Sequence, residues 1–462
     1  MNYFEILAQE QGFLQNNSSI SKLPILKSLI TTHLRREIIT RSIGNSYNPA
    51  NMLLSSHASY VTLLNFEYVI RKILFLFHKS KKGSIKKDQI LLSPYMCSRF
   101  PDLIHRLSNK YNVLFFITAL NFRFSRHQKS DYKLKIHNNI FNKKQTKLLK
   151  ILFEYIRHDF LNQIQLRQLD EAFLNQIETQ LESTVLRIQM KIESENISQF
   201  ITCYDNRFDD LLIAHACKRA KIPSKELAHG VNNYTLQNGQ TMAPATLDYL
   251  LVWKKQMRDA CLDYGGDEER IQIIGYPKYT LSKYQSLQLK FPVRKQIIYF
   301  SQPVYDIFDG PSHKITPEII ELEKKFRLDL FKNIDTFAYK NDFDVIIRYH
   351  HGEKNTPTYS RDEEISFLEK NTKIIVSKQS FEQDIYQSEI CLGINTSCIY
   401  ESFLLNKKCF QIRFPLNDKC YHDEIPIISV SEILSLNSKK AHIKSSADFG
   451  FINDEILISI GK

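Results

Sequence analysis

Short apolar segments alternate with amphipathic segments along most of the chain, and this alternation limits the possible folds more than any other feature. The apolar runs at 90–93, 113–117, 200–204 and 224–228 predict buried strands, and the segments 100–111 and 210–220 between them predict helices. Strands that alternate with helices form parallel sheets covered by helices on both faces. The sequence therefore predicts an α/β protein.

The same alternation begins again after a break at Gly275-Tyr276-Pro277. Further strands are predicted at 296–301, 343–349, 373–376, 390–393 and 410–412, with helices at 317–333 and from near Ser397. A chain of 462 residues is also too long for one ordinary domain. We therefore predict two Rossmann-like domains that face each other across a cleft, at 1–277 and 278–462.

Two parts of the first domain depart from the alternation. Apolar residues at helical spacing, such as Ile177, Leu181 and Val185, predict a helical insertion at 145–196. The first ~50 residues, a segment below ordinary domain size, are predicted to form extra helices and loops.

The chain carries 62 Lys plus Arg against 50 Asp plus Glu, a formal net charge of +12. Much of the basic excess lies at 79–87 and 123–147. Such a surplus fits nucleic acid, an anionic membrane surface or phosphorylated substrates. A solvated basic face would also explain it, but we expect peripheral contact with an anionic membrane.

Cysteine usage and the apolar stretches favour the cytoplasm, at the inner face of the cytoplasmic membrane. The eight cysteines form no CxxC pair, so no metal site is expected, and scattered free thiols fit a reducing compartment. We see no signal peptide at the start of the sequence. The apolar stretch 68–77 contains Arg71 and Lys72 and is too short to span a bilayer.

Ligands of parallel α/β sheets bind at the carboxyl ends of the strands, so polar residues that follow predicted strands are candidates for function. His229 and Gly230 follow one strand of the first domain, and Asp205 and Asp209 follow another. A glycine allows close approach of the backbone to a ligand, and a carboxylate or imidazole can act as a general base. A capping role for the histidine, and a helix-start role for the aspartates, are the alternatives.

In the second domain, Asn395, Thr396 and Ser397 precede a predicted helix. Such residues cap helices, and together with the backbone N–H groups they also form an anion site. Glu401 follows one helical turn later, where its carboxylate could accept hydrogen bonds from a ribose. Capping alone would explain the hydroxyl residues.

Two further candidates end strands of the second domain. His350 follows the strand 343–349, where an imidazole can donate to a phosphate oxygen. Ser301 ends the first strand of this domain, and we assign it to the same ligand-binding site as His350. The alternative for His350 is that it and His351 are simply two histidines of a surface loop.

These segments, taken in order, resemble bacterial glycosyltransferases of the GT-B architecture that assemble capsule and lipopolysaccharide. The matching elements are His229-Gly230, the segments 248–253 and 270–277, Arg348-Tyr349-His350, and Asn395-Thr396-Ser397 with Glu401. Sialyltransferase-like, Kdo-transferase-like and teichoic-acid glycerophosphotransferase-like enzymes share them. The resemblance covers roughly the last three fifths of the chain, about two domains. His351 stands where these families usually have Pro.

The resemblance implies a role for each candidate residue. His350, Thr396 and Ser397 would hold the donor phosphate, Glu401 its ribose or base, and Asn395, Ser301 and Gly230 would complete the donor site. Asp209, His229 or Asp205 would be the general base. The implied reaction is metal-independent transfer of a sugar, and we favour a sialic-acid-like nonulosonic acid carried by CMP. The acceptor would be an oligosaccharide or a lipid-linked glycan, and no cofactor beyond the nucleotide-sugar donor is expected.

Three other functions remain open at this point. A polyol-phosphate transferase that uses CDP-glycerol or CDP-ribitol would share the fold. A sugar-nucleotide epimerase would act without an acceptor. A non-catalytic basic protein could bind nucleic acid, although the sequence has no zinc finger or comparable recognition motif, so we expect no nucleic-acid partner.

Overall fold

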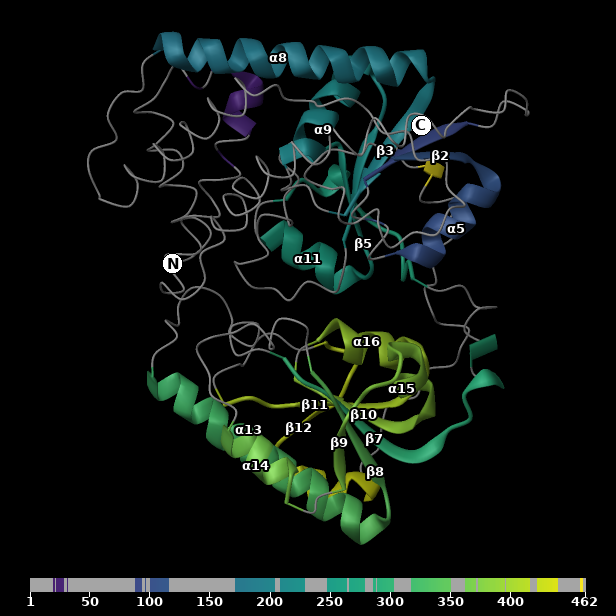
Figure 1. Cartoon of the computed structure of the whole chain (residues 1–462), viewed down its shortest axis with the longest axis vertical. Coiled ribbons are helices and arrows are strands. Elements are labelled where there is room, and N and C mark those ends of the chain that lie inside the picture. The colour runs from purple at the N-terminus through teal and green to yellow at the C-terminus, as the bar shows by residue number, and fades with distance from the viewer. Residues whose placement is uncertain are drawn as a thin grey trace, which may run out of the picture.

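The protein is an α/β structure built on two parallel sheets of six strands each. The computed structural model in Figure 1 describes residues 20, 22–28, 31, 88–93, 96, 100–115, 171–203, 208–228, 247–263, 266–278, 286–287, 289–302, 317–349, 362–370, 373–394, 396–415, 422–438 and 458–459. We call the part around the first sheet the first lobe and the part around the second sheet the second lobe. The predicted fold class, two Rossmann-like halves of GT-B type, is confirmed.

The first sheet has the strand order β2-β1-β3-β4-β5-β6, and all its strands run parallel. Its strands are β1 (Gln89–Leu92), β2 (Asn112–Phe115), β3 (Ile197–Thr202), β4 (Ser224–Leu227), β5 (Tyr249–Val252) and β6 (Ile271–Ile273). The order reverses between β1 and β3, which makes the carboxyl ends of these two strands the switch point of the sheet.

Helices cover this sheet. Their apolar residues recur at helical spacing and so form one apolar face, which packs against the sheet or against a neighbouring helix. They are α5 (Pro101–Lys110), α8 (Glu171–Ser194), α9 (Phe208–Ala220), α11 (Lys255–Asp263) and the short η3 (Glu268–Arg270). The long α8 packs against α9 at the end of the lobe away from the second sheet (Figure 1). Its buried stripe runs from Leu174 to Ile192, so the predicted insertion is helical where it is described. None of the described helices has the length and apolar character needed to cross a membrane.

The second sheet has the order β12-β11-β10-β7-β8-β9. Its strands are β7 (Arg294–Phe300), β8 (Asp344–Arg348), β9 (Ile374–Val376), β10 (Ser388–Gly393), β11 (Lys408–Ile412) and β12 (Ile427–Ile428). Numbered within the lobe, this is the 3-2-1-4-5-6 order of dinucleotide-binding sheets. Its switch point lies between β7 and β10, where the chain order reverses.

Both faces of β7 are buried, as expected for a central parallel strand. Ile297 and Tyr299 pack on one face against α13 (Pro317–Asn341). Ile298 and Phe300 pack on the other face, in the cluster that contains α15 (Phe381–Gln387) and α16 (Ser397–Leu404). The second lobe is completed by α14 (Asp362–Leu368) and η7 (Ser431–Ser438).

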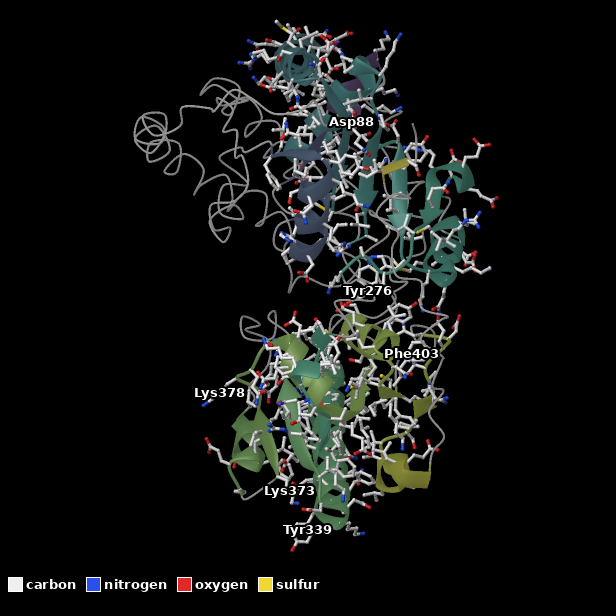
Figure 2. The ribbon with its side chains drawn as sticks, turned by 90° about the vertical axis from the view of Figure 1, so that its right-hand side faces the viewer. Asp88, Tyr276, Tyr339, Lys373, Lys378 and Phe403 are labelled. Atoms are coloured by element: carbon white, nitrogen blue, oxygen red, sulfur yellow. The ribbon has the colours of Figure 1, made fainter. Side chains whose placement is uncertain are left out.

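The two lobes share buried contacts at the carboxyl ends of their sheets. Ile274 and Tyr276, after β6, belong to the same apolar cluster as Ile399 and Tyr400 of α16. Gly275 between them has φ of 82°, a conformation that glycine adopts without strain, and it turns the chain out of the sheet. Figure 2 shows Tyr276 and Phe403 on either side of this junction. The predicted domain boundary after 277 lies between β6 and β7 and stays a prediction.

Residues 458–459 lie in the first lobe, far along the chain from the strands that they contact (Figure 1). Ile458 is buried in the cluster that includes β1, β4 and β5. Its carbonyl accepts a hydrogen bond from the fully buried ammonium of Lys225 at 3.3 Å, and that ammonium also donates to Gln199 at 2.7 Å. These contacts give a charged group in a central strand the partners that burial requires.

Candidate functional site

The turn from β10 into α16 lies at the switch point of the second sheet. Thr396 caps the helix, with its Oγ1 accepting from the backbone N–H of Cys398 at 3.2 Å. Gly393 makes the turn possible, because a Cβ there would lie 3.0 Å from Thr396 Cγ2 and 3.4 Å from Ile399 Cβ. Ser397 is the first residue of the helix and is half-buried. The predicted helix start is therefore confirmed, while its role in phosphate binding stays a prediction.

Two cations from different segments act on the first turn of α16. Burial, and after it the Glu401 charge, raise the pKa of the Cys398 thiol to about 11, against the charges of Lys278 and Arg348, which both act to lower it. Lys278 lies in the segment after β6, and Arg348 ends β8. Their side chains keep 26% and 31% of their surface exposed, so both remain accessible to a ligand. The charges of both cations therefore extend to this turn, where the helix N-terminus also favours an anion.

Arg348 is held in place by α15 and by the segment that joins β9 to it. Its Nη1 donates to Asp384 Oδ2 at 2.6 Å and to the carbonyl of Gln379 at 3.2 Å. The guanidinium lies 5.5 Å from the ring centroid of Phe381, and the Ser377 hydroxyl donates to the same Asp384 oxygen. Since Asp384 is fully buried, this pair fixes the direction of the arginine.

Ser301 lies at the carboxyl end of β7, as predicted, but its hydroxyl belongs to a buried ion-pair network. Its Oγ accepts from Arg327 Nη1 at 2.8 Å. Arg327 pairs with Glu364 through two hydrogen bonds of 2.7 and 3.0 Å, and the Tyr349 hydroxyl donates to Glu364. This network joins α13 and α14 to the ends of β7 and β8. A role of Ser301 in donor binding stays a prediction.

Glu401, in the second turn of α16, is fully buried. Its Oε2 accepts from the Tyr276 hydroxyl at 2.8 Å, and its Oε1 accepts from the Lys278 ammonium. The Trp253 ring packs edge-on against Tyr276 at 5.3 Å. The carboxylate thus joins α16 to the segment after β6. The predicted contact of Glu401 with a ribose stays a prediction. A ribose hydroxyl would donate to the same carboxylate that already accepts from Tyr276 and Lys278.

A second polar contact crosses the lobe junction at Lys254, between β5 and α11. Its Nζ donates to Glu424 Oε2 at 2.8 Å and lies 4.4 Å from the ring centroid of Tyr400. The same atom lies 3.4 Å from His422 Nδ1. Beside it, Gln256 Nε2 donates to Asp423 at 2.8 Å. None of these residues is among the candidates predicted from the sequence, although Lys254, like several of those candidates, is a polar residue close to the end of a strand.

His422 connects Lys254 to the start of α16. Burial, and after it the Lys254 charge, lower the pKa of His422 to about 3, so the ring is neutral at neutral pH. Its Nε2 lies 3.2 Å from the carbonyl oxygen of Thr396, which can only accept, so Nε2 carries the proton. Nδ1 then accepts from Lys254. No sequence pattern distinguishes this histidine from a surface one.

Half of the ten predicted catalytic and donor residues belong to segments that the structure does not describe. His229, Gly230, Asp205, His350 and Asn395 lie outside the described residues, as do the basic segments at 79–87 and 123–147. Asp209 lies in the first turn of α9, at the carboxyl side of β3.

The neighbour of Asp209 is better defined. Asp210 is fully buried and accepts from Thr202 at 2.7 Å and from Ser93 at 3.2 Å. It joins the ends of β3 and β1 at the switch point of the first sheet. In the part of the chain that the structure describes, no three His, Cys, Asp or Glu side chains gather as metal ligands would.

Comparison with known proteins finds similarity only among solved structures. No protein-family model and no curated protein sequence matches the chain. UDP-GlcNAc 2-epimerase from Methanocaldococcus jannaschii aligns at 13% identity with a TM-score of 0.48, over 81% of this chain and 99% of that one. HepE of Anabaena, solved with UDP and glucose, aligns at 11% identity with a TM-score of 0.42, over 76% and 89%. The epimerase from Neisseria meningitidis aligns at 13% identity with a TM-score of 0.41, over 71% and 82%.

Proposed function

We propose that the protein is an enzyme that acts on a nucleotide-activated sugar, with the phosphate of the nucleotide bound at the first turn of α16. The observation that supports this most is the capped start of α16, with the partly exposed ammonium of Lys278 held on the same helix by Glu401. The charges of Lys278 and Arg348 both act on Cys398 in that turn. The turn also lies at the switch point of a dinucleotide-type sheet, where such sheets bind their ligands.

The two cations would share the phosphate charge in different ways. Arg348 is directed by Asp384, and its planar guanidinium suits two oxygens of one phosphate. Lys278 is a compact charge on a flexible stem, already paired with Glu401 on one side. Ser397 would add its hydroxyl, and His350 and Asn395 would complete the donor site as the sequence analysis expects.

The donor and the reaction form the finer part of the proposal. We favour a CMP-linked sialic-acid-like sugar, with transfer to an oligosaccharide or lipid-linked glycan at a membrane surface. Asp205, Asp209 or His229 would accept the proton of the acceptor hydroxyl. CDP-glycerol or CDP-ribitol is the alternative donor class.

Epimerisation is the alternative reaction, and it differs from transfer in what it consumes. Transfer requires an acceptor and releases a nucleotide, whereas epimerisation changes the sugar without either. Incubation of each nucleotide sugar with and without a glycan acceptor, followed by chromatography, separates them. A changed nucleotide sugar in the acceptor-free sample would identify an epimerase.

Binding tests the proposal at the level of the site. The melting temperature is measured with CMP, CDP, UDP, GDP, CMP-sialic acid and UDP-GlcNAc, because a ligand of the native state raises it. We expect a cytidine nucleotide to give the largest rise. Lys278→Gln and Arg348→Gln should reduce that rise, since both keep a hydrogen-bond donor but remove the charge.

Lys373→Gln is the matched control. Lys373 lies at the opposite end of the second lobe from Tyr276 (Figure 2) and pairs with the exposed Asp342. Equal effects of Lys278→Gln and Lys373→Gln would contradict the proposed site, and nucleic-acid binding without any nucleotide effect would favour the non-catalytic alternative.

A further inference from the structure

We propose that Lys254 and His422 are positioning residues, which make the nucleotide affinity of the second lobe depend on its docking with the first lobe. The inference rests on the proposed function, because it concerns the phosphate site at the first turn of α16. It adds a link between that site and the arrangement of the lobes.

The side chain of Lys254 contacts the second lobe. It belongs to the first lobe, between β5 and α11, yet Glu424, Tyr400 and His422, which contact its ammonium, all belong to the second lobe. The residue is 6% exposed. A buried ammonium needs its partners, so separation of the lobes would return Lys254 to water and remove it from His422.

Lys254 influences which nitrogen of the His422 ring carries the proton. The partner of one ring nitrogen decides which nitrogen carries the proton. With Lys254 donating to Nδ1, the proton stays on Nε2 and is directed at the carbonyl oxygen of Thr396. Without Lys254, the other tautomer becomes accessible, and it would place a lone pair of Nε2 against that oxygen.

The backbone of His422 is held in place, so only its ring can respond to the loss of Lys254. Its backbone is fixed by Gln411, whose side chain accepts from the His422 N–H and donates to the His422 carbonyl, both at 2.8 Å. The ring packs beside Tyr400 at 5.2 Å. A change at Nδ1 therefore appears at Nε2 and not as a movement of the segment.

Thr396 makes two contacts with the first turn of α16. Its carbonyl oxygen accepts from the Ile399 N–H at 3.1 Å, and its hydroxyl caps the N–H of Cys398. The direction of the first-turn N–H groups thus depends on this residue. A weaker hold on Thr396 would loosen the group that is proposed to bind phosphate.

A second contact across the junction ends on the same helix. Glu401, one turn beyond Ser397, accepts from Tyr276 and Lys278 of the first lobe side. The first lobe therefore holds α16 at both its first and second turns. Docking of the lobes and the geometry of the anion site are joined through one short helix.

The test measures the Kd of CDP and of UDP for the full chain by calorimetry. Lys254→Met and His422→Leu should each weaken binding of the better nucleotide about tenfold, the effect of one lost hydrogen bond in a buried network. His422→Gln keeps an amide N–H for the Thr396 carbonyl and should weaken binding less than His422→Leu. The Lys254→Met/His422→Leu double variant should bind about as well as either single variant, because both changes interrupt the same chain.

Gln256→Ala is the matched control. It removes the adjacent contact with Asp423 at the same junction, which does not reach α16, and should leave the Kd unchanged. Melting curves confirm that each variant is folded. Unchanged Kd values for Lys254→Met, or additive effects in the double variant, would overturn the inference even if Lys278→Gln weakens binding as the proposed function requires. Absence of nucleotide binding by the unaltered protein would overturn both.

Discussion

The hydroxyl of Tyr276 donates to the buried carboxylate of Glu401 at 2.8 Å, across the junction of the two lobes. Tyr276 follows β6 in the first lobe, and Glu401 lies in the second turn of α16. The bond connects the segment that leaves the first sheet to the helix that begins at the candidate phosphate site. Its loss would leave a buried carboxylate oxygen without this donor.

Tyr276→Phe should therefore lower the stability of the protein. The variant keeps the ring and its packing on Trp253 but removes the donor to Glu401, which should cost about 1–3 kcal/mol. The midpoint of urea unfolding measures the effect. Tyr339→Phe is the control, since Tyr339 is 78% exposed at the far end of the second lobe (Figure 2). Equal midpoints for the two variants would show that the bond contributes nothing.

The pKa of His422 predicts a loss of stability in mild acid. Burial, and then the Lys254 charge, lower this pKa from 6.5 to about 3. A histidine that stays neutral in the folded state stabilises it fully above the unfolded pKa, and this contribution decreases as the pH falls from 6.5 towards 3. At pH 5 the loss should be about 2 kcal/mol from this residue.

His422→Gln measures that contribution, because glutamine does not titrate. The unfolding midpoints of the variant and the unaltered protein are compared between about pH 7.5 and pH 5. The variant should lose less stability over this range. Other groups, such as His215 with its pKa lowered to about 4 by burial and nearby cations, act equally in both proteins. Parallel pH curves would contradict the assignment of His422 as a buried neutral group.

Gly393→Ala should displace the turn from β10 into α16. The new Cβ would lie 3.0 Å from Thr396 Cγ2, so the capping residue must move. We expect lower stability and weaker nucleotide binding, measured by melting temperature and calorimetry. Thr396→Ser removes the methyl group but keeps the capping hydroxyl, and should partly restore both properties when combined with Gly393→Ala. A double variant no better than Gly393→Ala alone would contradict this contact as the cause.

Much of the fold could be predicted because its information is local. The runs around Ile298, Ile346 and Leu392 are apolar, short and followed by polar residues, and each forms a central strand of the second sheet. The helix start at Thr396 could also be predicted, since capping depends on neighbours in the sequence. By contrast, α15 was missed because it has only seven residues, although Ser380 accepts from the Gln383 N–H as a capping residue does.

The candidate site was predicted only in part, because its contacts join distant segments. Glu401 was placed one turn into α16 from spacing, but its contacts with Tyr276 and Lys278 depend on how the lobes dock. Lys254 and His422 are 168 positions apart, and nothing near either residue indicates the other. Docking of two sheets is a property of their surfaces and not of any local pattern.

The ion pair between Arg327 and Glu364 supports the carboxyl ends of β7 and β8 and gives the last prediction. Both residues are almost fully buried, and the pair is bidentate. Glu364→Gln would replace the charged partner in both of these hydrogen bonds with a neutral amide while the guanidinium stays buried, which should cost about 3 kcal/mol.

Glu321→Gln is the control for this change. It breaks an exposed pair with Lys324 on α13, the same helix that carries Arg327, and should cost no more than about 0.5 kcal/mol. Urea unfolding of both variants measures the difference. A similar cost for the two would mean that water or other groups compensate Arg327. A large difference would show that this buried network, with Ser301 in it, stabilises the strand ends where the nucleotide is proposed to bind.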